Sequence, residues 1–279
     1  MTTSVSVIIP TWNRKNVLPR ALHSVLNQTV KPDEIIVVDD GSTDGTAGLV
    51  KRDFPDVKLV SKKNAGVSSA RNTGIVKSTH QWIAFLDSDD EWLPTKIEKQ
   101  LDHFQKNPKA VLIHTDEIWI RNGVRVNPMK KHEKSGGWIF EKCLPLCLIS
   151  PSSVLIKRAL FSEIGMFDEL LEVCEDYDLW LRICSKYPVH YLVEKLIVKY
   201  GGHEDQLSRK HWGMDRFRIQ ALDKLISDET LSDSYKNAAI KMLIEKAKIV
   251  LQGANKRENE MVIEECQNFI RKFRIKNVD

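Results

Sequence analysis

The fold is decided at residues 34–42, which read EIIVVDDGS. Four apolar β-branched residues in succession predict a strand buried on both faces, and Asp39, Asp40 and Gly41 mark its end. Outward from it, similar strands are expected at 5–9, ending before Pro10, at 57–60 and at 82–86, with helical patterns at 17–26 and 66–77 between them. Alternating strands and helices of this kind predict an α/β fold with a mostly parallel, Rossmann-like sheet flanked by helices.

The rest of the chain divides into a mixed region and a helical tail. Strands are expected at 111–114, 117–120, 152–156 and 189–193, with a hairpin turn at Asn122-Gly123 and a helix from Asp178 to Lys186. From Asp215 onward only the helical period remains. We therefore expect a main domain at 1–212 and a C-terminal helical appendage at 213–279, which packs on it and provides a surface for self-association.

Composition excludes several classes of protein. The 279 residues are 42% hydrophobic and 29% charged, which is typical of a globular protein and excludes wholesale disorder and a disulfide miniprotein. The net charge of +4 fits an anionic ligand or an acidic membrane surface but requires neither. Five cysteines, an odd number without a CxxC pair, favour a reduced, cytoplasmic setting. We expect no signal peptide, because no basic segment followed by a long apolar segment opens the sequence. We expect no membrane-spanning segment, because no apolar run reaches about 20 residues.

Polar residues follow three of the predicted strands, at 11–14, 39–42 and 87–90. Ligands of open α/β sheets bind beyond the carboxyl ends of the strands, so these residues are expected to meet at one edge of the sheet.

The turn DSD at 87–89 is the strongest chemical signal. Two carboxylates placed directly after a buried strand are costly unless they are paired or bind a cation, and hard oxygen ligands suit Mg²⁺ or Mn²⁺. The alternatives are a calcium loop or an acidic turn that caps the helix starting near Pro94.

A second acidic cluster, at Asp39 and Asp40, suits nucleotide recognition, since a carboxylate at a strand end can accept a hydrogen bond from a base N–H. A receiver domain fits less well, because the third strand ends in Ser61-Lys62-Lys63 rather than in an aspartate. Helix capping by one of the two acids stays open. Arg71 is expected either to bind a base or phosphate or to lie on a helix surface.

Two later segments carry further candidates. The acids of EDYD at 175–178 open a helix, where they suit its dipole, and one of them is a candidate general base. His203 follows a glycine pair and is either a metal ligand or diphosphate contact, or a structural or solvated histidine.

Six stretches in this order resemble the inverting glycosyltransferases of family two, which have the GT-A fold. They cover about residues 4–210 and read as follows: VSVIIPTWNR (5–14), SVLNQT (24–29), IVVDDGSTD (36–44), NAG with ARNTG (64–66 and 70–74), FLDSDD (85–90) and EDYDLWLR (175–182).

The resemblance implies a role for each matching position. Asp176 would be the catalytic base, and Asp89 would be the direct metal ligand of the DxD motif, with Asp87 and His203 beside it. The nucleotide pocket would be formed by Pro10, Thr11, Trp12, Asn13, Asp40, Arg71, Asp87 and Ser88.

The resemblance also implies a function, the metal-dependent, inverting transfer of a sugar from a nucleotide-diphospho-sugar to a hydroxyl acceptor. The expected donor is a UDP-sugar, and the expected acceptor is a glycan or a lipid-linked molecule. The reaction would serve polysaccharide or glycoconjugate assembly. The cofactor would be Mn²⁺ or Mg²⁺, and no nucleic acid is expected as a partner. A lipid-linked acceptor would bring the protein to the inner face of the membrane as a peripheral protein. The alternatives are a silent sugar-nucleotide-binding module and, less favoured, a nucleotidyltransferase.

Overall fold

The structure is a computed structural model that describes residues 4–202 and 212–274. In this part of the chain a nine-stranded sheet has the order β3-β2-β1-β4-β8-β6-β9-β5, with β7 paired to β6. The strands are β1 (Val5–Thr11), β2 (Glu34–Asp39), β3 (Lys58–Ser61), β4 (Trp82–Phe85), β5 (Glu91–Trp92), β6 (Leu112–Arg121), β7 (Val124–Val126), β8 (Leu155–Lys157) and β9 (His190–Gly201).

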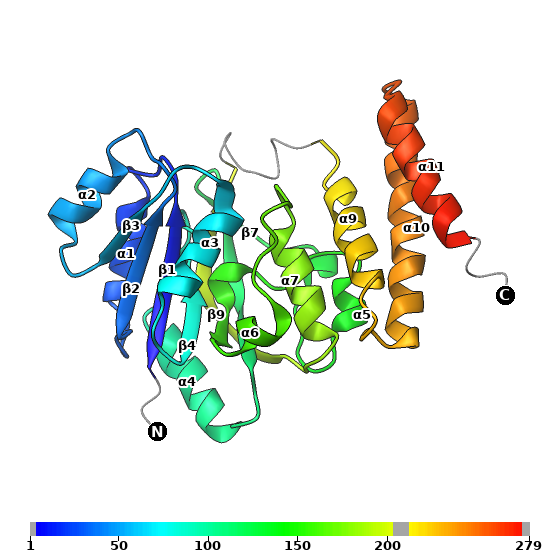
Figure 1. The fold of residues 1–279 in the computed structure, drawn as a ribbon. Helices are drawn as coiled ribbons and strands as arrows, with labels where there is room; N and C mark the ends of the chain where they lie inside the picture. Colours follow the sequence, from blue (N-terminus) through cyan, green and yellow to red (C-terminus); the bar gives the residue numbers. More distant parts are fainter. Residues whose placement is uncertain (1–3, 203–211, 275–279) are drawn as a thin grey trace.

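Helices lie on both sides of the sheet and extend beyond it at the C-terminal end (Figure 1). They are α1 (Leu18–Leu26), α2 (Thr46–Asp53), α3 (Gly66–Lys77), α4 (Lys96–Lys106), α5 (Phe140–Cys143), α6 (Leu160–Ile164), α7 (Glu175–Cys184), α9 (Asp215–Ile226), α10 (Asp233–Asn255) and α11 (Glu260–Arg274), with short 3₁₀ turns at η1 (Lys130–His132) and η2 (Pro151–Ser153).

The first four strands of the chain form the expected parallel, Rossmann-like half of the sheet. β1 pairs in parallel with β2 and β4, and β2 pairs in parallel with β3. The antiparallel strand β8 then joins this half to β6, and β6 and β9 are again parallel. The sheet is therefore mixed, and its parallel half brings the ends of β1, β2 and β4 to one edge.

The strands β1, β2 and β4 are largely buried on both faces, as their apolar runs predict. Alternate residues of one strand enter two different cores. Val7 and Ile9 belong to the core that includes α1 and α4, whereas Ile8 belongs to the core that includes α3 and that continues to the C-terminal helices. The same division separates Val37 from Ile36 in β2. Two faces with separate cores explain why these strands read as continuous apolar runs.

Three sequence predictions were wrong in detail. β1 continues through Pro10 to Thr11 and pairs there with β2, which is tolerated because the ladder to β4 has already ended at Ile8. The two strands expected at 111–114 and 117–120 are the single strand β6, with a register shift at Asp116. The strand expected at 152–156 is shortened to β8 by the turn η2.

Other predictions are confirmed. α3 spans residues 66–77 as expected, and the hairpin between β6 and β7 turns at Asn122 and Gly123, which both have positive φ, at 49° and 77°. Gly74 lets α3 approach β1 closely, because a Cβ built there would lie 2.3 Å from Cγ2 of Ile8.

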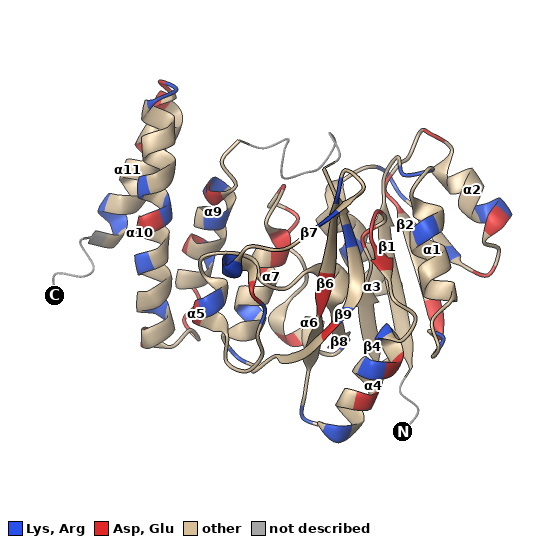
Figure 2. Cartoon of the chain, turned by 180° about the vertical axis from the view of Figure 1, so that it is seen from behind, with Lys and Arg blue, Asp and Glu red and all other residues tan. Residues whose placement is uncertain are grey.

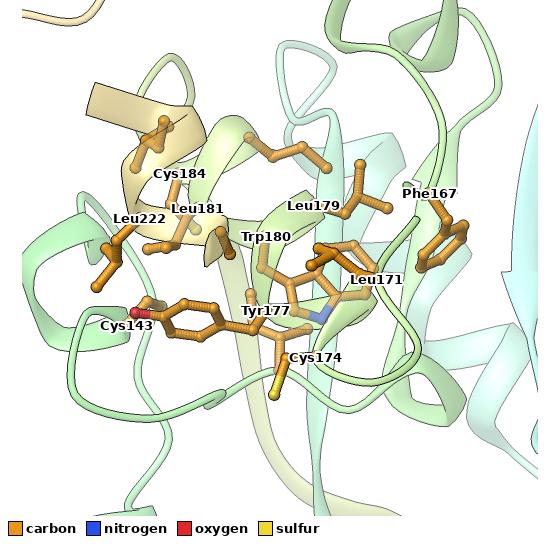
Figure 3. Close-up of a cluster of buried hydrophobic side chains, with 14 of the residues drawn as sticks. Cys143, Phe167, Leu171, Cys174, Tyr177, Leu179, Trp180, Leu181, Cys184 and Leu222 are labelled. Carbon is orange, nitrogen blue, oxygen red and sulfur yellow. The ribbon is translucent and has the colours of Figure 1, made fainter. Parts of the chain in front are cut away.

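The C-terminal helices share the core of the main domain. Leu222 of α9 packs with residues of α7 and α5, and Tyr177 of α7 points into this cluster beside Cys143 (Figure 3). The Tyr177 hydroxyl donates a hydrogen bond of 2.6 Å to the carbonyl oxygen of Leu144. The helical appendage is thus present, whereas its separation as a unit beginning at residue 213 stays a prediction. Among the described residues, no helix has the length and apolar character needed to cross a membrane.

Candidate functional site

A cleft of about 590 Å³ opens at the edge where β1, β2 and β4 end. Every predicted site residue that the structure describes lines it: Pro10, Thr11, Trp12, Asn13, Asp40, Arg71, Asp87, Ser88, Asp89 and Asp176. His203 lies outside the described residues. Segments far apart in the sequence therefore converge at one place, as the strand-end argument predicted.

The loop after β1 forms one wall of the cleft. Asn13 has a positive φ of 52°, a conformation that asparagine tolerates better than most residues. Its backbone N–H donates to Ser42 Oγ at 2.8 Å, and its side-chain oxygen accepts from the N–H of Thr43 at 2.8 Å. These bonds fix the loop after β1 to the loop after β2. Trp12 lines the cleft beside Asn13 and is 46% exposed.

Asp40 is buried and holds the start of α3. Its carboxylate accepts hydrogen bonds from the backbone N–H groups of Ala65, at 3.1 Å, and Gly66, at 2.8 Å. It also forms an ion pair with the Lys62 ammonium at 2.7 Å. The open question of helix capping is thus answered for Asp40, which binds the first N–H groups of α3. A carboxylate offers about four acceptor positions, so three donors leave room for one more.

The DSD turn is tied to η2. The backbone N–H of Asp87 donates to Ser152 Oγ at 3.1 Å, and the Ser152 hydroxyl donates to Asp90 at 2.6 Å. Burial raises the pKa of Asp90 to about 8, and burial together with the charge of Asp87 raises the pKa of Asp89. The turn does not cap the next helix, because β5 lies between it and α4, which begins at Lys96.

Arg71 joins the DSD turn to the start of α7. Its side chain is 4% exposed and forms two ion pairs through separate nitrogens, with Asp87 at 2.7 Å and with Glu175 at 2.5 Å. The alternative of a surface arginine on a helix was wrong, since α3 directs Arg71 inward. Burial raises the pKa of Glu175 to about 7, although Arg71 opposes this shift.

Asp176 lies in the first turn of α7, one residue after Glu175. Its Oδ1 accepts the N–H of Tyr177 at 2.7 Å, and its Oδ2 accepts the Cys147 thiol at 3.3 Å. Cys174, which precedes the helix, has a positive φ of 65°. This left-handed residue turns the chain into α7 at the wall of the cleft, where a partly exposed carboxylate can meet a ligand.

Sequence reasoning missed three charged residues at the cleft. Glu175 was seen as one of the acids that open a helix and among which a general base was sought, but its ion pair with Arg71 depends on the tertiary fold. Asp90 belongs to the same run of acids as Asp87 and Asp89, which was the available signal. Lys199 lies in β9 and lines the cleft, but nothing in the pattern of that strand distinguishes it.

The donor set suits a hard divalent cation in part. Asp87 and Asp89 supply carboxylate oxygens, the ligands that Mg²⁺ and Mn²⁺ prefer. Within residues 4–202 and 212–274, no group of three or more His, Cys, Asp or Glu side chains is arranged to hold a metal. Two carboxylates still fit Mg²⁺, which keeps several waters and is commonly shared with substrate phosphates.

Comparison with known proteins identifies the family. The sequence profile described as "Glycosyl transferase family 2" matches residues 6–165, more than half of the chain. The chain belongs to glycosyltransferase family 2. This family 2 chain is 40% identical, over 185 residues, to an uncharacterised glycosyltransferase of Rickettsia bellii. The matched region covers 65% of this chain and 26% of that protein.

A second relative has a described activity. It is the UDP-Glc:alpha-D-GlcNAc-diphosphoundecaprenol beta-1,3-glucosyltransferase WfaP of Escherichia coli, 33% identical over 191 residues, covering 65% of this chain and 70% of WfaP. The chain spans only about a quarter to a third of the length of the first Rickettsia relatives that it matches.

The fold matches that of a solved structure. The structure of S. aureus TarS 1-349 in complex with UDP-GlcNAc superposes with a TM-score of 0.68 at 20% identity, over 87% of this chain and 71% of that one. This agreement confirms the GT-A fold with additional C-terminal helices.

Proposed function

We propose that this family 2 chain transfers a sugar, with inversion, from a nucleotide-diphospho-sugar to a hydroxyl acceptor in polysaccharide or glycoconjugate assembly. The observation that carries the proposal is the single cleft in which a strand-end carboxylate, the DSD turn and the first turn of α7 meet. The activity of WfaP and the UDP-GlcNAc complex of TarS support a UDP-sugar as donor.

The base would bind at the β1 and β2 ends of the cleft. Asp40 has one acceptor position left for a ring N–H, and the exposed indole of Trp12 offers an apolar face beside it. Pro10, Thr11, Asn13 and Ser88 would complete the nucleotide pocket, with Arg71 fixing Asp87.

Asp89 and Asp87 would hold Mn²⁺ or Mg²⁺, with His203 as a further ligand. When bound, the cation would neutralise charge on the diphosphate leaving group as a Lewis acid. Asp176 would take the proton of the acceptor hydroxyl as that oxygen attacks the anomeric carbon from the face opposite the leaving group. A single displacement inverts the configuration and needs no protein nucleophile.

The acceptor is proposed to be a glycan or a lipid-linked sugar, because the WfaP acceptor is a diphosphoundecaprenol-linked sugar. Such an acceptor would place this protein in the cytoplasm, peripherally bound at the inner face of the membrane. The silent-module alternative leaves Asp176 without a purpose, since binding alone requires no base. A nucleotidyltransferase would release pyrophosphate instead of a nucleoside diphosphate.

The proposal is tested by product analysis with purified protein, UDP-sugars, candidate lipid-linked acceptors and Mn²⁺. We expect release of UDP, loss of turnover with EDTA, and recovery when Mn²⁺ is restored. Asp176→Asn is expected to lower kcat at least a thousandfold while UDP affinity stays within about threefold, since a general base together with its positioning contributes roughly this much. Turnover at the wild-type rate by Asp176→Asn would exclude Asp176 as the base.

The metal ligands are tested separately by calorimetry. Asp89→Ala is expected to abolish the strengthening of UDP binding by Mn²⁺, whereas Asp102→Ala, an exposed acid of α4, serves as the matched control and is expected to behave as the wild type. Equal Mn²⁺ dependence in both variants would contradict the metal assignment.

A further inference from the structure

Lys199 is a charged residue of the cleft to which the proposed mechanism gives no role. It lies near the end of β9 and lines the cleft together with six acidic residues, four of which are the three acids of residues 87–90 and the second residue of α7. We call these four the acid cluster: Asp87, Asp89, Asp90 and Asp176. Figure 2 shows acidic and basic segments close together in the centre of the molecule, between α7 and α3.

The acid cluster by itself would repel a diphosphate. Four carboxylates carry up to four negative charges, and a diphosphate would bring more into the same space. Arg71 lines the cleft as well, but its guanidinium is already engaged by Asp87 at 2.7 Å and Glu175 at 2.5 Å. Arg14 also lines the cleft, where its charge opposes the rise in the pKa of Asp89. Phosphate binding in this cleft therefore requires protein cations beyond Arg71, and Lys199 is the one that β9 supplies.

The contacts of Lys199 leave its ammonium able to serve this purpose. Among the residues that the structure describes, the Lys199 ammonium donates a hydrogen bond to the neutral hydroxyl of Ser150, at a long 3.4 Å. An ammonium has three donors, so at least two are available to a ligand in the cleft.

Electrostatics keep this lysine charged. Burial lowers the pKa of Lys199, but surrounding carboxylates outweigh it and raise the pKa above its ordinary value: those of Glu117, Asp90, Asp87 and Asp176. In return, the charge of Lys199 lowers the pKa of Asp89 and of Asp90 against the effect of burial. The lysine and the acid cluster therefore interact strongly.

A hydrogen-bond network also positions Lys199 through the hydroxyl of Ser150. Ser150 donates to Glu117 at 2.7 Å, and Glu117 pairs with the buried Lys134 at 2.7 Å. This network anchors the hydroxyl that Lys199 contacts, so that the ammonium is positioned without being neutralised by a direct ion pair within the described residues.

We propose that Lys199 is a diphosphate-binding residue: its ammonium balances part of the charge of the acid cluster and donates hydrogen bonds to the phosphates of the donor. This inference rests on the proposed function, and it adds a protein cation that binds phosphate beside the expected metal.

The two parts of the proposal predict opposite effects of one substitution, Lys199→Met. Without the ammonium, UDP binding measured by calorimetry in EDTA is expected to weaken roughly tenfold or more, the value of a hydrogen bond to a charged group. Binding of Mn²⁺ alone, followed by electron paramagnetic resonance, is expected to strengthen by about fivefold, because one positive charge beside the acid cluster has been removed.

Two further variants make the test specific. Lys199→Arg keeps the charge and is expected to bind both UDP and Mn²⁺ within about threefold of the wild type. Lys195→Met removes the same side chain from the same strand at a position that does not line the cleft, and no change is expected. Circular dichroism of each variant verifies folding, and if Lys199→Met does not fold, Lys199→Gln replaces it.

The outcomes separate the two proposals. If the wild type binds UDP and Lys199→Met binds UDP and Mn²⁺ with the same affinities as the wild type, the role of Lys199 is overturned and the proposed function stays intact. Weaker binding of Mn²⁺ in Lys199→Met would likewise overturn it, because it would mean that the substitution damages the acid cluster. If the wild type binds no nucleoside diphosphate, with or without Mn²⁺, both proposals fall.

Discussion

Replacing Arg71 by methionine tests the connection on which the cleft depends. The guanidinium joins Asp87 and Glu175 through two different nitrogens, and the Arg71 and Glu175 side chains are 4% and 8% exposed. Removing one partner of a buried ion pair leaves an uncompensated charge and costs about 3–5 kcal/mol. We therefore expect Arg71→Met to lower the free energy of unfolding by about that amount, measured by urea denaturation.

The second variant shows whether the cost comes from unpaired charge. Adding Glu175→Gln to Arg71→Met removes the buried carboxylate, so the double variant is expected to be more stable than Arg71→Met alone. Burial already raises the pKa of Glu175 to about 7, and without Arg71 it rises further. Protonation of Glu175 then removes the unpaired buried charge, so the destabilisation caused by Arg71→Met is expected to be smaller at pH 6 than at pH 8.

A surface pair provides the control. Arg52 forms an ion pair with Asp53 at 2.7 Å, but their side chains are 69% and 42% exposed. Arg52→Met is expected to leave the urea midpoint unchanged. A loss below about 1 kcal/mol in Arg71→Met, or a double variant less stable than the single one, would refute the role assigned to Arg71.

Three further outcomes follow from the packing and the buried groups. Gly74→Ala is expected to lose about 1–3 kcal/mol of stability by thermal denaturation, because its Cβ would meet Ile8 at 2.3 Å; an unchanged Tm would contradict this close approach. Tyr177→Phe is expected to lose about 1–2 kcal/mol in urea, since the carbonyl of Leu144 loses its hydrogen bond, and a neutral result would mean that water replaces the hydroxyl. Burial lowers the pKa of His114 to about 3, so folding favours the neutral ring and its contribution to stability is lost as the pH falls from about 6.5 towards 3; His114→Gln is expected to lose less stability than the wild type over this range, and parallel pH profiles would disprove it.

Much of the fold follows from local patterns. The apolar runs of β1, β2 and β4 require burial on both faces, and the helical periods between them leave a parallel arrangement as the natural solution. The extension of β1 through Pro10 was not predictable, because it depends on where β4 ends. The union of two predicted strands in β6 likewise depends on a register shift against β9.

The site was predictable only where residues follow strand ends or open a helix. The positions of Asp40, Asp89 and Asp176 follow from that rule, and all three line the cleft. The partners of these residues were not predictable. The ion pair of Arg71 with Glu175 spans 104 positions in the sequence. The electrostatic interaction of Lys199 with the acid cluster requires β9 to pair with β5, which follows the DSD turn.

A crystal structure with UDP and Mn²⁺ bound is the most direct test of the central claim. The account predicts the base against Asp40, the diphosphate and the cation at Asp87 and Asp89, and Asp176 facing the open position beyond the β-phosphate. A nucleotide bound outside this cleft, or a cation held without Asp89, would contradict it.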